Sequence, residues 1–227
     1  MRSSGTVRAR YHHGDLRNAL IGAAVELAQS GGPGSVTIRA AARAVGVTPT
    51  AAYRHFAGHE ELLSAVRDQA LDRMGEAVDV EFARLSETGP PAQRALRRLV
   101  AIGRGYLAFV AAEPGLFRTA LTQPLPMLPP IRTAWDAGPF QQVIAVLDEL
   151  AAAGFLPVQR RGMAEVTVWA AVHGLAMLYL DGPLRTSDEE SRLLAFERTV
   201  EIIGVGLGGP ALPAELHAEL RELVRGG

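Results

Sequence analysis

The stretch from Thr37 to Phe56 limits the possible folds of this chain more than any other, because it predicts two short helices joined by a tight turn. We expect the first helix over residues 38–45. The Thr37 hydroxyl would be its N-cap, since it can accept a hydrogen bond from an otherwise unpaired amide of the first turn. Gly46 would end the helix, because glycine takes the left-handed conformation of a sharp reversal without steric cost.

The second short helix would begin directly after that turn. Thr48 is its expected N-cap, and Pro49 would take the first helical position, where the missing amide proton costs nothing. We expect this helix to run for about two turns, long enough to enter a major groove. Ala42 and Ala52 would face each other across the turn, because only small side chains let two short helices cross closely. The stretch therefore predicts a helix-turn-helix.

These residues resemble the N-terminal DNA-binding domain of the TetR family of bacterial transcription regulators. The resemblance is carried by Thr37 before an apolar helix, Ala42 four residues before Gly46, the Thr48-Pro49-Thr50 start, Tyr53, the His55-Phe56 pair and Glu60-Glu61-Leu62-Leu63. It covers roughly residues 15–65. One position departs from the family pattern, because His59 stands where a lysine is common. A histidine is a weaker, pH-dependent phosphate contact.

The resemblance implies that the outer face of the second helix reads DNA. Threonine and alanine there can contact thymine methyl groups, while the flanking residues hold the phosphate backbone. The candidate DNA-contacting residues are Thr37, Arg39, Arg43, Thr48, Pro49, Thr50, Ala51, Tyr53, Arg54, His55 and His59.

The charge of the chain is uneven. Residues 1–60 hold seven arginines against three acidic residues, a net charge of +4, so the remainder carries −5 because the whole chain carries −1. A basic end on an acidic body suits a protein that binds phosphates at one end only. The alternative DNA-binding function is that of an architectural protein. Such a protein would need a basic body, and the negative charge after residue 60 argues against it.

Three segments are expected. Residues 1–14 would be a flexible basic arm, residues 15–60 the helix-turn-helix domain, with Asp15 capping its first helix, and residues 61–227 a C-terminal domain for ligand binding and dimerisation. The arm lacks the apolar core of a signal peptide or membrane anchor, so we expect a cytoplasmic protein with no membrane partner. The chain has no cysteine, which excludes disulfides and thiolate metal sites.

The C-terminal segment predicts a helical bundle. Its expected helices cover 58–85, 92–112, 140–153, 163–180 and 188–207, followed by a short helix near 213–224 to which we assign no function. The amphipathic pattern of the second of these places four arginines on its outside, namely Arg94, Arg97, Arg98 and Arg104. The fold class is therefore all-α.

The proline-rich stretch 116–139 lies between these helices. Its many prolines forbid a long regular helix, and an irregular apolar segment between packed helices is where a bundle can open a cavity. The alternative, that these residues only fill the core, stays open. The candidate pocket residues are Tyr106, Phe109, Phe117, Met127, Trp135, Phe140, Trp169, His173 and Met177. They suggest a small apolar effector with one or two polar groups.

The helix over 163–180 is apolar on all faces, which predicts burial between its own core and a second subunit. The run from Trp169 to Leu178, with Asp181-Gly182-Pro183-Leu184 after it, resembles the WHG-type C-terminal domain of one branch of TetR-like regulators. In the TetR family the last two long helices pair with their copies. The resemblance therefore implies a homodimer that binds a palindromic double-stranded DNA operator.

The best interpretation is a ligand-responsive transcriptional repressor, in which a ligand in the bundle tilts the helix that connects it to the DNA reader. An enzyme is the competing class. The chain shows no paired catalytic carboxylates, Ser-His-Asp order, zinc spacing or nucleotide loop, so we expect no catalytic residue, metal or cofactor. His173 is the only histidine of the C-terminal core, and Asp181 lies about two turns away on a different face.

Overall fold

The structure, a computed structural model, describes residues 13–121, 139–208 and 214–225. Every regular element within these ranges is a helix, which confirms the all-α fold class. The chain divides into two compact units, one of Met1–Ala70 with Gly115–Gln123 and one of Leu71–Pro114 with Pro124–Gly227. We call them the N-terminal unit and the C-terminal unit.

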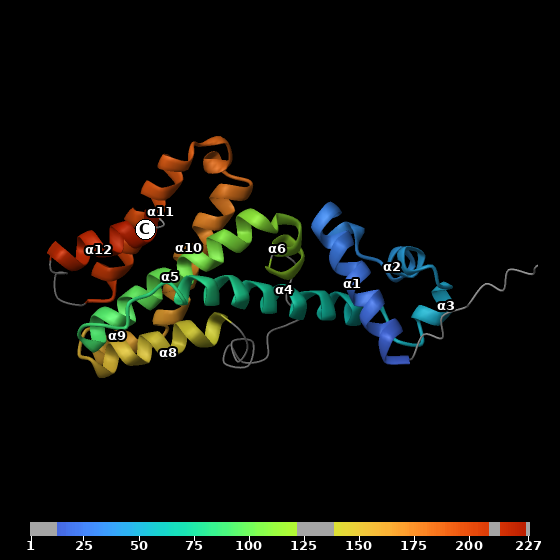
Figure 1. Ribbon diagram of the computed structural model, residues 1–227, viewed down its shortest axis with the longest axis horizontal. Helices are drawn as coiled ribbons and strands as arrows, with labels where there is room; N and C mark the ends of the chain where they lie inside the picture. The colour runs from blue at the N-terminus through green and yellow to red at the C-terminus, as the bar shows by residue number, and fades with distance from the viewer. Residues whose placement is uncertain (1–12, 122–138, 209–213, 226–227) are drawn as a thin grey trace, which may run out of the picture. The chain divides into compact units, whose positions relative to one another are not determined.

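The N-terminal unit is a small helical domain (Figure 1). It contains α1 (His13–Gly31), the short 3-10 helix η1 (Pro33–Ser35), α2 (Ile38–Val45), α3 (Pro49–Ala52), the first half of α4 (His59–Phe82) and nearly all of α6 (Pro114–Leu121). Its core includes Leu20, Phe56, Leu62 and Val66, all of them buried. Leu62 and Val66 of α4 belong to this core. The unit therefore extends to Ala70, ten residues beyond the expected boundary at residue 60.

Two expectations for this unit need correction. Helix α1 begins at His13, so Asp15 lies within its first turn and not at its cap. The stretch after residue 114 is not irregular from its start, because α6 runs to Leu121. Pro114 is compatible with helix there, since a proline in the first turn removes no helical hydrogen bond.

Gly115 lets α6 lie directly on α1. A Cβ atom at this position would be 2.3 Å from the carbonyl oxygen of Ala28. The neighbouring Phe117 is fully buried in this unit.

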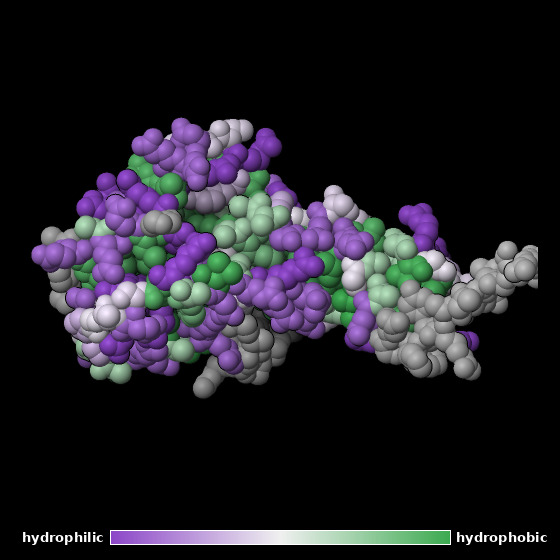
Figure 2. Space-filling model, in the orientation of Figure 1, coloured by the Kyte–Doolittle hydropathy of each residue, from purple (hydrophilic) through white to green (hydrophobic). Residues whose placement is uncertain are grey.

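The C-terminal unit is a bundle around α5 (Figure 1). It holds the second half of α4, α5 (Pro91–Ala112), α8 (Pro139–Ala152), the short α9 (Val158–Arg161), α10 (Ala164–Leu180), the 3-10 helix η2 (Pro183–Thr186), α11 (Glu189–Gly206) and α12 (Ala214–Arg225). Helix α5 packs against α8, α10 and α12, and α11 packs against α10 and α12. The visible face of this unit is mostly hydrophilic, with hydrophobic residues showing as separate patches (Figure 2).

Two glycines of α5 set its closest contacts. A Cβ atom at Gly105 would lie 2.6 Å from the Cα atom of Val78, so α4 and α5 touch backbone to backbone here. A Cβ atom at Gly103 would lie 2.9 Å from the ring of Phe196 on α11. The position of Gly105 needs a residue without a side chain because its neighbour is backbone, whereas at Gly103 the neighbour is the end of the Phe196 side chain.

Arg97 contradicts the expected pattern of α5. The amphipathic spacing predicts it on the outside, but it is only 6% exposed. The reason is α12, which covers this side of α5 and offers Glu219 as a partner. The helical period of α5 alone cannot reveal a helix that docks from more than a hundred residues away.

Among the described residues, no single helix has the length and apolar character needed to cross a membrane, although α5 and α6 taken together would pass by length and composition.

Replacing Gly105 by alanine should lower the free energy of unfolding by about 1–3 kcal/mol, the usual cost of forcing an extra methyl group into a packed interior. The new methyl group would meet the Val78 backbone, which has no flexible end that can move away. Urea unfolding followed by circular dichroism measures the change. Gly75→Ala on α4 is the control, because its added methyl group meets nothing within 4 Å. Equal losses in both variants would contradict the close crossing.

Candidate nucleic-acid interface and ligand cavity

The turn between α2 and α3 has the predicted geometry. The Thr37 hydroxyl accepts a hydrogen bond from the amide of Ala40 at 3.0 Å, and the Thr48 hydroxyl accepts one from the amide of Ala51 at 3.3 Å. Gly46 has φ 78° and ψ 27°, the left-handed conformation. Both N-caps and the glycine stop are therefore confirmed.

Helix α3 is shorter than expected. It covers only Pro49–Ala52, and the chain continues through a turn in which the amides of His55 and Phe56 donate to the Ala52 carbonyl at 2.9 and 3.2 Å. The helix stops because Phe56 must enter the core, where it is 1% exposed. The Arg17 guanidinium lies over the Phe56 ring, 5.0 Å from its centroid.

The eleven candidate DNA contacts lie at the surface of this unit. Nine are exposed, and Ala51 and His55 are half-buried. Tyr53, the largest of them, is 50% exposed. Ala42 and Ala52, expected between α2 and α3, are fully buried.

A cavity lies inside the C-terminal unit, with a volume of about 60 Å³. Six helices form its wall, namely α4, α5, α8, α10, α11 and α12. Its lining residues are Met74, Leu96, Leu99, Val100, Ile102, Gly103, Tyr106, Phe140, Val143, Val168, Trp169, Val172, Phe196, Val200, Ile203, Gly204 and Leu220. No charged side chain is among them.

The polar end of the cavity is neutral. The Tyr106 hydroxyl lies 2.7 Å from Nδ1 of His173, a hydrogen bond whose direction depends on the histidine tautomer. Burial lowers the pKa of His173, so the imidazole is uncharged at pH 7. Burial also raises the pKa of Tyr106, which keeps the phenol protonated. An ionic ligand would find no opposite charge here to replace its lost hydration.

Four predicted pocket residues form one aromatic row. The rings of Phe140 and Trp169 meet edge to face at 5.8 Å, and the rings of Trp169 and His173 lie 5.0 Å apart. Tyr106 continues the row through its hydrogen bond to His173. Three of these four line the cavity, and His173 contacts two of those three.

The other five predicted pocket residues are not in this wall. Phe109 and Met177 belong to α5 and α10 but are not among the lining residues. The prediction that Phe117 lines the pocket is wrong, because α6 places this residue in the core of the N-terminal unit. Met127 and Trp135 lie outside the described residues.

Sequence reasoning missed the aliphatic part of the wall. It selected aromatic residues and two methionines, whereas the wall follows helical spacing, with positions 99, 103 and 106 on α5 and positions 196, 200 and 203 on α11. This i, i+4, i+7 pattern marks one face of a helix. The glycine at 103, inside an apolar stripe, was the available signal. Among the described residues, no three His, Asp or Glu side chains come together as a metal site.

Two family profiles match the chain. The profile described as bacterial regulatory proteins, tetR family, matches residues 20–66, and the profile described as tetracyclin repressor-like, C-terminal domain, matches residues 99–203. The WHG-type assignment of the C-terminal domain is not among these matches and stays a prediction. No curated protein matches the chain.

Solved structures share the fold. A protein of unknown function from Rhodococcus sp. RHA1 aligns with TM-score 0.69 at 21% identity, covering 88% of this chain and 98% of that one. A putative tetR family transcription regulator from Shewanella sp. PV-4 gives 0.56 at 21% identity, covering 82% and 96%. A tetR-family transcriptional regulator from Streptomyces coelicolor gives 0.53 at 22% identity, covering 95% and 90%.

The family profiles account for both halves of the architecture, since one covers the helix-turn-helix and the other covers most of the bundle around the cavity. Regulators of this family bind DNA operators and are not enzymes. The chain belongs to the TetR family of DNA-binding transcriptional regulators.

Proposed function

We propose that this regulator is a cytoplasmic, ligand-responsive repressor that binds a palindromic operator as a homodimer. Helix α4 carries the proposal. Its residues Leu62 and Val66 are buried in the DNA-reading unit, while Met74 of the same helix lines the cavity. A change in the cavity wall can therefore act on the helix that supports the DNA reader.

Two copies of the N-terminal unit would read two half-sites. A two-fold dimer needs a two-fold operator, so each Thr48–Tyr53 segment would enter one major groove. The exposed threonines suit thymine methyl groups, and Arg39 and Arg43 suit the phosphates on either side. We therefore propose that the eleven candidate residues of the N-terminal unit contact the operator DNA directly.

The proposed dimer surface is the outer face of α10 and α11. On α11, Ile202 and Val205 are 72% and 78% exposed, and Leu194 is exposed as well. On α10, Leu178 is exposed, together with the small residues at 170 and 174, which are spaced four apart along the helix. A second copy that covers these side chains would remove their apolar surface from water.

The proposed effector is small, uncharged and largely apolar, with one group that hydrogen-bonds at the Tyr106–His173 end. The neutral, apolar lining supports this class, because a buried charge would lack a partner. The ligand would shift the equilibrium by binding better to the dimer geometry that does not fit the operator.

Selection of bound sequences from random duplex DNA, combined with mass measurement of the complex, tests the proposal. An enriched inverted repeat bound by two copies is the expected result. Binding without any enriched sequence, at salt where simple phosphate attraction has faded, would replace it with the architectural function. No DNA binding would reopen the question of an enzyme.

Tyr53→Ala should weaken binding to the selected operator by roughly tenfold or more, since one good base or phosphate contact contributes about 1–3 kcal/mol. Gel shift measures it. Gln69→Ala, at an exposed position of α4 in the same unit, should bind like the wild type. Retained affinity in Tyr53→Ala would contradict the assignment of α3 as the reading element.

Val205→Glu should convert the dimer to monomers, because it places a charge at the most exposed large apolar residue of α11. Sedimentation velocity measures the mass, and operator affinity should fall with it. The control is Val80→Glu, at an exposed valine of α4. A Val205→Glu protein that stays dimeric would move the interface elsewhere.

Val172→Phe should block the cavity, since Val172 lines it and the larger ring fills its space. The neutral fluorescent probe N-phenyl-1-naphthylamine reports binding by its emission. Its affinity should fall roughly tenfold, the effect of about 1.4 kcal/mol of overpacking. Ala145→Phe on the exposed face of α8 should leave the affinity unchanged. Unaltered binding in Val172→Phe would place the probe outside the cavity.

A further inference from the structure

The size of the cavity requires that a wall moves when a ligand binds. Its volume of about 60 Å³ is well below the roughly 150 Å³ that admits benzene in an apolar protein cavity. An apolar ligand of that size or larger therefore has to displace some of the lining. At least one of the six helices that form the wall therefore has to move.

Two of the six helices, α4 and α12, each add a single residue to this wall, and α12 docks through one short apolar row. It contributes one lining residue, Leu220, which lies in a row with Leu216 and Val224, the three buried residues spaced four apart. It is also the last described helix, and it lies beyond the C-terminal family match, which ends at residue 203. The family match therefore assigns no role to α12.

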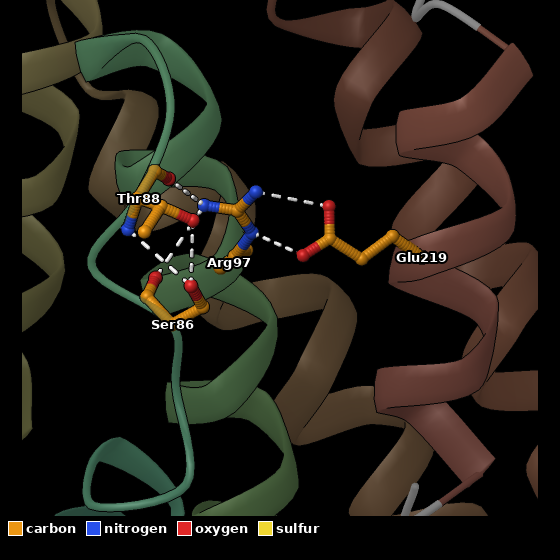
Figure 3. Close-up of polar contacts among 4 residues, drawn as sticks. All are labelled: Ser86, Thr88, Arg97 and Glu219. Atoms are coloured by element: carbon orange, nitrogen blue, oxygen red, sulfur yellow. Dashed lines mark hydrogen bonds and ion pairs between the residues drawn. The ribbon is translucent and has the colours of Figure 1, made fainter.

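Polar contacts add to this apolar row and hold α12 in place. The buried Arg97 guanidinium binds both carboxylate oxygens of Glu219, with Nε–Oε1 at 2.5 Å and the second nitrogen–oxygen pair at 2.9 Å (Figure 3). Glu219 itself is 43% exposed in its side chain, so water can compete for it. Arg221 and Arg225 of α12 add longer ion pairs to Glu197 of α11, at 3.9 and 3.5 Å.

The same arginine reaches the end of α4. Its remaining nitrogen donates to the Thr88 carbonyl at 2.7 Å and to the Ser86 carbonyl at 3.4 Å, both in the connection between α4 and α5 (Figure 3). Arg104, two turns further along α5, pairs with Glu81 of α4 at 2.7 Å and donates to the Leu223 carbonyl of α12. Two arginines thus join α12 to the last turn of α4 and to its connection.

We propose that α12 is the movable wall of the effector site, held closed by the Arg97–Glu219 ion pair, and that its displacement by an uncharged apolar ligand is passed to the α4–α5 connection through Arg97 and Arg104. The proposal rests on the proposed function of the cavity as the effector site. It gives α12 a role in both ligand entry and response. When α12 moves away, Arg97 loses the Glu219 carboxylate and keeps only its hydrogen bonds to the Ser86 and Thr88 carbonyls. The α4–α5 connection is then no longer tied to α12 through Arg97.

The test uses the full chain and N-phenyl-1-naphthylamine, which is larger than the closed cavity. In the wild type, saturating probe should raise amide hydrogen exchange in 214–225 and in 83–90, the segment between α4 and α5. Glu219→Gln should bind the probe roughly tenfold more tightly, because a charged hydrogen-bonding partner worth about 1.4 kcal/mol no longer opposes opening.

The matched control is Glu222→Gln, the same change at an exposed position of the same helix, which should bind like the wild type. Glu219→Asp keeps the charge and shortens the side chain, so it weakens the same pair if Glu219→Gln does not fold.

Three outcomes overturn the proposal, and they are distinguishable. Probe binding that Val172→Phe weakens, with unchanged exchange in 214–225 and equal affinity in the two glutamine variants, would leave the cavity as the effector site with a rigid α12. Faster exchange in α12 but not in 83–90 would show that α12 moves without passing its displacement to the α4–α5 connection. Absence of probe binding in every variant would remove the cavity as the effector site, and the proposed ligand response with it.

Discussion

One helix supplies buried side chains to both units of this protein, and that constraint governs the rest. Along α4, the fully buried residues Leu62, Val66, Ala70, Met74 and Val78 follow one another at every fourth position. The first three belong to the N-terminal unit and the last two to the C-terminal unit. A row at this spacing forms a ridge along a helix. Neither core can be repacked without affecting α4, and the ligand cavity includes one residue of the same ridge.

Sequence reasoning succeeded where structure depends on neighbours in the chain. The caps at Thr37 and Thr48 and the reversal at Gly46 are decided within a few residues, so they were predicted residue by residue. The length of α3 was wrong for a tertiary reason, because Phe56 must leave the helical path to reach the core. Local propensity cannot weigh a hydrophobic contact that depends on the helices around it.

The cavity and the burial of Arg97 could not be predicted for the same reason. Helical spacing says which residues of α5 share a face, but the partner on that face comes from α12, at the far end of the chain. Without that partner, an arginine is most simply placed in water. Likewise, Phe117 is as apolar as Phe140, and only the docking of α6 on α1 assigns it to a different core. Residue type indicates burial, while location is set by packing.

The walls of the cavity differ in how far they can move. At Gly105 and Val78 the backbones of α5 and α4 are in contact, and interiors packed this closely transmit displacement instead of absorbing it. Helix α12 docks through one short apolar row and through ion pairs in which one partner is buried and the other is partly exposed to water. In the proposed mechanism the bundle opens at α12 and not at the stiff crossing of α4 and α5. Because the arginines that hold this wall also hold the end of α4, opening acts at the end of the one helix that both cores share.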